Sequence, residues 1–187
     1  MSRLGRSALM AAFLLIAVPA VAHAAGLPAD CSSAAIPSGP AKGSIADAAF
    51  VPSDVSVSVG ESGIGDGHTY DAYAFLFDGQ DKSGEAMSLS VTVIVPKGAA
   101  PDGKLFRMLP TDDTDKQPKA GPGAPEVQGW SLEYSAKNID TDFIDTVGSM
   151  RLELGRHAGK TLAGRIYLCV PNAGDSSLAG SFSATLQ

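Results

Sequence analysis

The sequence predicts an all-β protein: a mostly antiparallel β-sandwich or β-barrel, preceded by a cleaved signal peptide. Three observations lead to this prediction. Apolar residues alternate with polar ones in several short runs, turn-forming residues separate the runs, and no long segment shows the 3.6-residue period of an amphipathic helix. The 21 glycines and 12 prolines among the 187 residues also favour many turns over long helices.

The alternation of apolar and polar residues is clearest in five segments. Successive side chains of a strand point to opposite faces, so this pattern is typical of strands with one buried face. A sixth segment, residues 70–77, is less regular but rich in the aromatic residues that strands favour. The five regular segments are residues 55–60, 87–95, 150–154, 166–170 and 178–186.

Turn signals separate these segments, because Gly, Pro, Asn and Asp supply the backbone conformations that turns require. We find no internal repeat and no second domain, so we expect a single β domain over residues 43–187, after an extended lead at residues 25–42. The main turn signals are Gly-Asp-Gly at 65–67, Asp78-Gly79, Pro96-Lys97-Gly98, Pro101-Asp102-Gly103 and Pro171-Asn172.

The first 24 residues contain the three parts of a secretory signal peptide. Arg3 and Arg6 form a basic start, residues 8–18 form an apolar run, and residues 22–24 (Ala-His-Ala) supply the small residues of a cleavage site. A membrane-spanning helix needs roughly 20 apolar residues, and this run is shorter. We expect cleavage after Ala24 and a periplasmic or secreted product without a membrane span.

The chain is acidic once these residues are removed. Cleavage takes away two of the 14 basic residues and leaves 12 against 20 acidic ones, a net charge of −8. Nucleic acids and anionic membranes are bound through clustered Lys and Arg, whereas the basic residues of this chain are scattered. We therefore expect neither as a partner.

Cys31 and Cys169 are the two cysteines of the chain. Exported compartments are oxidising, so we expect them to form a disulfide, worth about 4–5 kcal/mol in the chain-entropy model. Because successive side chains of a strand point to opposite faces, Cys169 is expected to point away from the apolar face of residues 166–170. The lead is therefore expected to cross the outside of this strand. The alternatives are a buried free thiol at Cys169 and a catalytic thiol.

The closing segment carries a resemblance to a known group of proteins. GRIYLCVP (residues 164–171) followed by SSLAGSF (residues 176–182) is similar to the closing hairpin of small exported bacterial proteins of unknown function. Residues 42–50 resemble their first strand, and Asn172 stands where those proteins have Asp. The resemblance implies export and a β-sandwich, and it implies no activity.

The signals for catalysis are few, and we assign no catalytic residue. Residues 174–178 (GDSSL) resemble the motif of GDSL-type hydrolases, but their serine needs a histidine and an acid, and no histidine follows Ser176. A turn between the two closing strands explains these residues. No G-x-S-x-G motif is present.

The metal-binding signals are limited to acidic loops. His68 and His157 are each isolated in the sequence, so we expect no transition-metal site. Calcium prefers several oxygen ligands from flexible loops, and two acidic segments that met in space would supply them, although neither has the spacing of an EF-hand. The candidate calcium ligands are Asp112, Asp113, Asp115, Asp140 and Asp142.

Two further features suggest contact sites. Trp130 and Tyr134 share a strand face and, if exposed, would stack on a sugar ring; the alternative places Trp130 in the core. Residues 110–126 contain four prolines and almost no large apolar side chains. This composition favours a mobile surface loop over an ordered binding loop.

Together these features predict an exported, non-catalytic interaction or ligand-binding module. Its contacts are expected in residues 110–126 and the neighbouring acidic turns, because loops on a rigid scaffold commonly carry function. Its partner would be a protein or polysaccharide of the cell envelope or exterior. The alternative is an extracytoplasmic hydrolase of envelope or extracellular polymer, acting through carboxylates or an unrecognised triad.

Overall fold

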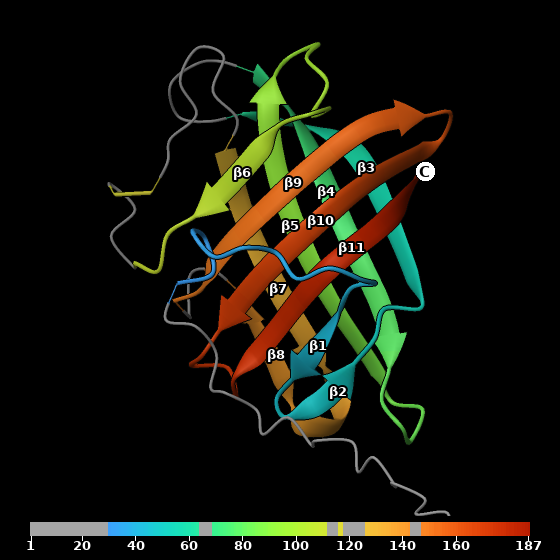
Figure 1. The fold of residues 1–187 in the computed structure, drawn as a ribbon, viewed down its shortest axis with the longest axis vertical. Coiled ribbons are helices and arrows are strands. Elements are labelled where there is room, and N and C mark those ends of the chain that lie inside the picture. Colours follow the sequence, from blue (N-terminus) through green and yellow to red (C-terminus); the bar gives the residue numbers. More distant parts are fainter. Residues whose placement is uncertain (1–29, 64–68, 112–115, 118–125, 143–146) are drawn as a thin grey trace, which may run out of the picture.

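The computed structural model describes residues 30–63, 69–111, 116–117, 126–142 and 147–187 (Figure 1). The expected signal peptide and the first part of the lead lie outside these residues, as does most of the 110–126 segment.

The described chain is almost entirely β, which confirms the all-β class, and every alternating segment lies within a strand. No helix in this part of the chain is long and apolar enough to cross a membrane. The elements are β1 (Lys42–Ile45), β2 (Ala48–Phe50), β3 (Asp54–Gly63), β4 (Thr69–Gln80), β5 (Ala86–Pro96), β6 (Leu105–Met108), β7 (Glu126–Tyr134), the 3-10 helix η1 (Ser135–Lys137), β8 (Ile139–Asp142), β9 (Ser149–Ala158), β10 (Thr161–Val170) and β11 (Ser176–Leu186).

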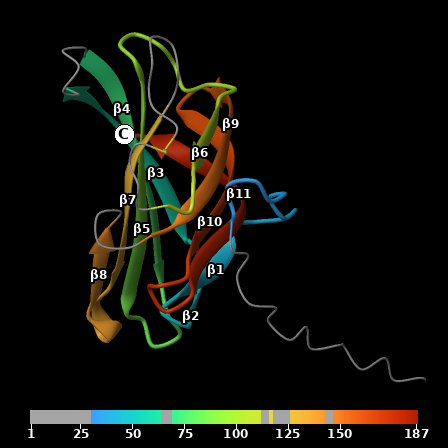
Figure 2. The ribbon, with the colours of Figure 1, turned by 90° about the vertical axis from the view of Figure 1, so that its left-hand side faces the viewer.

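The strands form one curled, mixed sheet of 11 strands, a half-barrel, so the predicted sandwich is not confirmed. The main path runs β6-β9-β10-β11-β3-β4-β5-β7-β8, and β1 and β2 branch from β11. Figure 2 shows the two arms of this sheet, β3-β4-β5-β7-β8 and β6-β9-β10-β11, curled toward each other. Strand pairing within each arm is antiparallel, whereas β3 and β11 pair in parallel where the arms meet.

The core lies on the inner face of the curl, where the apolar positions of the alternating strands meet. In β10, for example, buried Leu162 and Ile166 are each flanked by more exposed residues. Full burial of one such side chain contributes about 1.5–3 kcal/mol. The largest fully buried side chains include Phe50, Phe75, Phe77, Phe106, Met150 and Leu152, which come from both arms and from β2.

The predicted disulfide joins Cys31 to Cys169, with 5.9 Å between their Cα atoms. Both residues are fully buried, yet neither belongs to the inner core cluster. The lead crosses the outer side of β10, where Arg165 Nη2 donates to the carbonyl of Ile36 at 2.7 Å (Figure 1). The position of Cys169 on the outer face of its strand is therefore confirmed.

Beyond Ile36 the lead reaches the edge of β11. Ser181 N donates to the carbonyl of Gly39 and Ala41 N donates to the carbonyl of Ser181, each at 2.8 Å. The chain then forms β1 and β2, and the ring of Phe50 packs over Gly79 of β4. A Cβ at Gly79 would lie 2.8 Å from this ring, so the close approach of β2 requires glycine there.

We predict that replacing both Cys31 and Cys169 with serine lowers the free energy of unfolding by up to about 4–5 kcal/mol, because the bridge closes a ring that spans 138 positions. The measurement is guanidinium unfolding of the variant and of the oxidised wild type. Reduced wild type is the control and should unfold at the variant's midpoint. Equal midpoints for the oxidised protein and the variant would contradict this role.

Candidate functional site

Of the five candidate calcium ligands, the structure describes Asp140 and Asp142. Asp112, Asp113 and Asp115 lie outside the described residues. Asp140 is exposed on β8, and Asp142 ends the same strand. Among the described residues, no three His, Cys, Asp or Glu side chains come together as a metal site requires.

Trp130 and Tyr134 lie in the core, and each is only 3% exposed. Neither ring therefore offers an open face to a sugar, and the core alternative holds for Trp130. The hydroxyl of Tyr134 donates to Asp81 Oδ2 at 2.6 Å, which ties β7 to the β4–β5 turn. This hydrogen bond raises the pKa of Tyr134, while Ser83 and then Tyr134 hold the pKa of Asp81 below its ordinary value.

The other residues considered for chemistry have structural partners. His157 pairs with Asp102, which also accepts from the backbone N–H of His157 at 2.9 Å, so the pair holds the β5–β6 connection against β9. Ser176 is fully buried, and its hydroxyl donates to the carbonyl of Ala173 and accepts from the backbone N–H of Ala46. Ser176 thus begins β11, and its hydroxyl holds the turn between the two closing strands. His68 lies outside the described residues.

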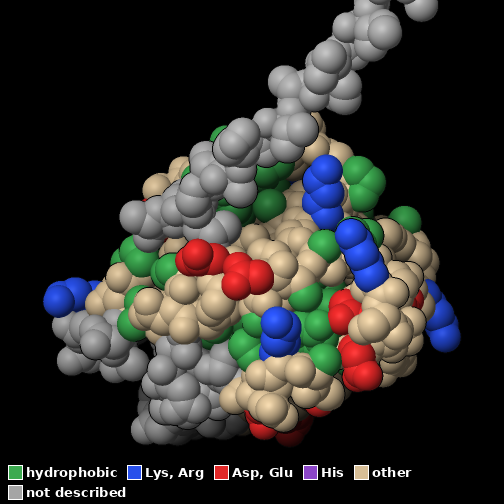
Figure 3. All heavy atoms as spheres, turned by 90° about the horizontal axis from the view of Figure 1, so that it is seen from below, with side chains coloured by type: hydrophobic (Ala, Val, Ile, Leu, Met, Phe, Trp, Pro, Cys, Tyr) green, Lys and Arg blue, Asp and Glu red, His purple; other side chains and the backbone are tan. Residues whose placement is uncertain are grey.

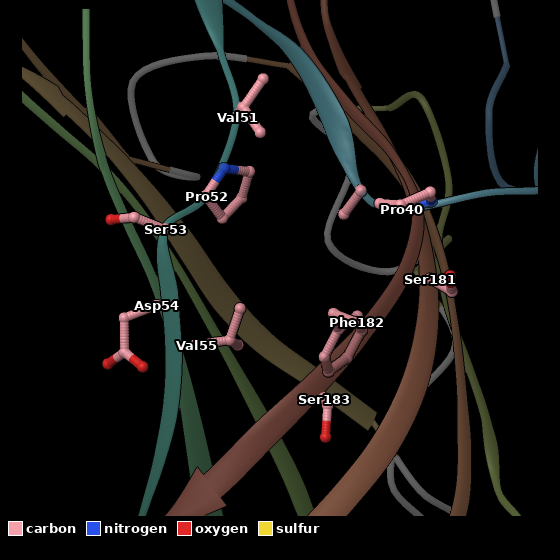
Figure 4. Close-up of a pocket in the computed structure, with 10 residues that line it drawn as sticks. Pro40, Val51, Pro52, Ser53, Asp54, Val55, Ser181, Phe182 and Ser183 are labelled. Carbon is pink, nitrogen blue, oxygen red and sulfur yellow. The ribbon is translucent and has the colours of Figure 1, made fainter.

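A groove opens where β3 and β11 part. These strands pair over only two positions, Thr185 with Ser56 and Leu186 with Val57. Toward the start of both strands they separate around a cavity of about 250 Å³ (Figure 4). We call this the β3–β11 groove. Its lining residues are Pro40, Ala41, Val51, Pro52, Ser53, Asp54, Val55, Ser181, Phe182 and Ser183.

The strands part because other segments use the same edge of β11. The lead pairs with Ser181, and β1 pairs with residues 177–179. On the opposite side, Pro52 has no backbone N–H to offer a sheet, and β3 begins only at Asp54. The groove therefore lies along the part of the β11 edge between the lead and the two-residue parallel contact with β3.

The walls of the groove are apolar. In Figure 4, Val51, Pro52 and Val55 point toward Phe182 and Pro40, whereas Ser53 and Asp54 point away on the other side of the chain. Val55 is 9% exposed and belongs to the core, while Val51 is 59% exposed. The groove thus leads from a solvent-exposed valine to the margin of the core.

Phe182 is held in place by the core beneath it. Its ring makes edge-on contacts with Phe77, at 5.0 Å between ring centroids, and with Phe75, at 6.0 Å. The ring also lies over Gly164, its cross-strand neighbour in β10, and a Cβ there would overlap it. This apolar wall is therefore ordered before any ligand arrives.

The charge beside the groove is negative. None of the ten lining residues is basic, and Asp54 is the one that carries a charge. Asp54 lies opposite Asp78 in the β3–β4 register. Burial and then the charge of Asp54 raise the pKa of Asp78. Figure 3, a view from below, shows basic side chains spread among acidic and apolar ones rather than gathered into a patch.

The lining residues offer apolar surface and few groups that act in catalysis. They include no histidine, cysteine, lysine or tyrosine, and Asp54 points away from the apolar walls. What they offer is apolar contact, serine hydroxyls and the backbone of two strands. Sequence reasoning missed this groove, because Val51 and Pro52 lie between strands and nothing local indicates that they face Phe182.

The chain matches no family model, and neither a curated protein nor a solved structure is significantly similar to it. The resemblance of the closing hairpin to small exported bacterial proteins stays a prediction.

We predict that Gly164→Ala destabilises the fold by about 1–3 kcal/mol, because the added Cβ displaces the ring of Phe182. Gly60→Ala on β3 is the matched control, since a Cβ there meets nothing within 4 Å. Denaturant unfolding measures both. The assignment fails if the two variants unfold at the same midpoint.

We predict that Asp78→Asn stabilises the protein at neutral pH. The pKa of Asp78 in the folded protein is raised above its ordinary value of 3.8, so the folded state favours the protonated carboxyl. This contribution to the free energy of unfolding is fully present below pH 3.8. It is lost as the pH rises through the folded-state pKa. The advantage of the variant should therefore vanish at about pH 3. Thermal unfolding at both pH values tests this, and a constant difference would contradict it.

Proposed function

We propose that this protein is an exported, non-catalytic binding module, and that the β3–β11 groove receives an apolar side chain of a partner protein. The observation that carries the proposal is the ordered apolar wall of Phe182 facing Val51, which is 59% exposed. Apolar surface of this kind at a concave site is typical of interaction surfaces.

The size of the groove favours a side chain over a larger ligand. Pockets for drug-sized molecules hold roughly 300–1,000 Å³, whereas this groove holds about 250 Å³. Protein interfaces commonly owe most of their affinity to a few apolar or aromatic anchors that fill such small pockets. Because Phe182 is already fixed by Phe75 and Phe77, little ordering of the groove is needed on binding.

Export is proposed from the signal-peptide pattern of residues 1–24 and is supported by the disulfide. Bridges such as Cys31–Cys169 persist in oxidising compartments, which include the periplasm and the cell exterior. The hydrolase alternative is less favoured. Asp54 is the one acidic residue that lines the groove, and it points away from the space a substrate would occupy.

We predict that Val51→Glu weakens binding of an aromatic side chain in the groove, since a charge at the rim opposes entry of an apolar group. The probe is N-acetyl-phenylalanine amide, titrated into the oxidised protein and followed by amide NMR shifts. In the wild type, the shifts should concentrate at residues 53–55 and 181–183. Val51→Glu should weaken binding at least tenfold.

Val59→Glu is the matched control, because Val59 is also an exposed valine, at 51%, and lies on β3 outside the groove. This variant should bind the probe as the wild type does. Shifts spread evenly over the surface, or equal losses in both variants, would refute the groove as the contact site.

A further inference from the structure

The backbone at the groove has a defined direction. The N–H and C=O groups of Ser181 both point to the lead, because they bond to Ala41 and Gly39. Backbone groups of alternate residues in a strand point to the same edge. The groups of Ser183 therefore point to this edge as well, away from β10.

Ser183 is the position at which the pairing of this edge is interrupted. On one side of it, Ser181 bonds to the lead, and on the other, Thr185 pairs with Ser56 of β3. Two further steps of the parallel register would bring Ser183 against Asp54, but the two strands have already separated there. Within the described residues, no strand pairs with Ser183 on this edge.

The groove therefore combines two features: apolar walls and a short stretch of open strand edge on its floor. A purely apolar ligand would fill the space but leave the N–H and C=O groups of Ser183 without protein partners. An extended polypeptide satisfies both requirements, because its backbone pairs with the edge while a side chain enters the pocket.

The charges beside the groove indicate which polypeptide fits best. Asp54 and its cross-strand neighbour Asp78 are both acidic, and no basic residue lines the groove. An acidic segment would be repelled at this position, whereas a lysine or arginine next to the apolar anchor would complement it.

We infer that the β3–β11 groove binds an extended segment of a partner protein by strand addition: its backbone pairs with Ser183, an apolar side chain enters between Val55 and Phe182, and a neighbouring basic residue faces Asp54. This inference rests on the proposed function and adds the mode of recognition and the chemistry of the partner.

The test uses the peptide acetyl-Lys-Val-Phe-Val-Lys-amide and the variants Ser183→Pro and Ser183→Ala. Proline at this position removes the open N–H. Because that group faces away from β10, the substitution removes no hydrogen bond of the β10–β11 ladder. Alanine removes only the hydroxyl. By NMR titration, the wild type should bind the peptide at least tenfold more tightly than the capped phenylalanine. Ser183→Pro should lose that gain, and Ser183→Ala should bind within twofold of the wild type.

A second comparison does not depend on the folding of the proline variant. A peptide N-methylated at the phenylalanine has the same side chains but lacks one backbone donor, and it should bind the wild type at least tenfold more weakly. Replacing both lysines of the peptide with glutamates should weaken binding similarly, and Asp54→Asn should reduce that difference.

The outcomes separate the two proposals. If the capped phenylalanine binds in the groove but the peptide gains nothing from its backbone, strand addition is wrong and the proposed function stands. If neither the amino acid nor the peptide binds, both proposals are overturned. If the glutamate peptide binds as well as the lysine peptide, the assignment of a basic partner is wrong.

Discussion

The two arms of the sheet are joined through a parallel contact of only two residue pairs between β3 and β11. One edge of β11 serves three partners in succession, since β1, the lead and β3 each take a short stretch of it. β1 cannot extend its pairing without displacing the lead, and neither the lead nor β3 reaches Ser183. The gap left at Ser183 therefore follows from how the edge is shared, and the groove lies at that gap.

The disulfide is part of the same arrangement. The lead forms no strand of its own before β1, so its position depends on the contacts that anchor it to the sheet. Here Cys31 is bonded to Cys169, Ile36 accepts from Arg165, and Gly39 accepts from Ser181. These contacts place Pro40 as one wall of the groove. The covalent bond that suits an oxidising compartment thus also helps to shape the candidate binding surface.

The features that the sequence predicted correctly are local or depend on simple parity. Alternation identified the strands, and the parity of Cys169 within its strand placed the lead on the outer face. Long-range features were not accessible in this way. The parallel contact joins the first long strand, β3, to the last, β11. Turn signals do not indicate which distant strands become neighbours. The sequence therefore did not distinguish one curled sheet from a sandwich.

Trp130 shows the same limit at the scale of one side chain. Period-2 alternation places Trp130 and Tyr134 on one face, but it does not say whether that face is covered. The structure covers it, and both residues belong to the core. In contrast, Val51 lies in a connection that carries no periodic pattern, and its exposure beside Phe182 follows only from the meeting of the two arms.

The position of the groove links binding to the stability of the sheet. A segment seated there would contact β3 through Val55 and β11 through Phe182, one strand from each arm. Any ligand that binds the folded state and not the unfolded chain stabilises the fold by mass action. Because this ligand would span the short contact that joins the arms, its binding would oppose their separation first. A partner seated in the groove would therefore also reinforce the shortest pairing of the main sheet path.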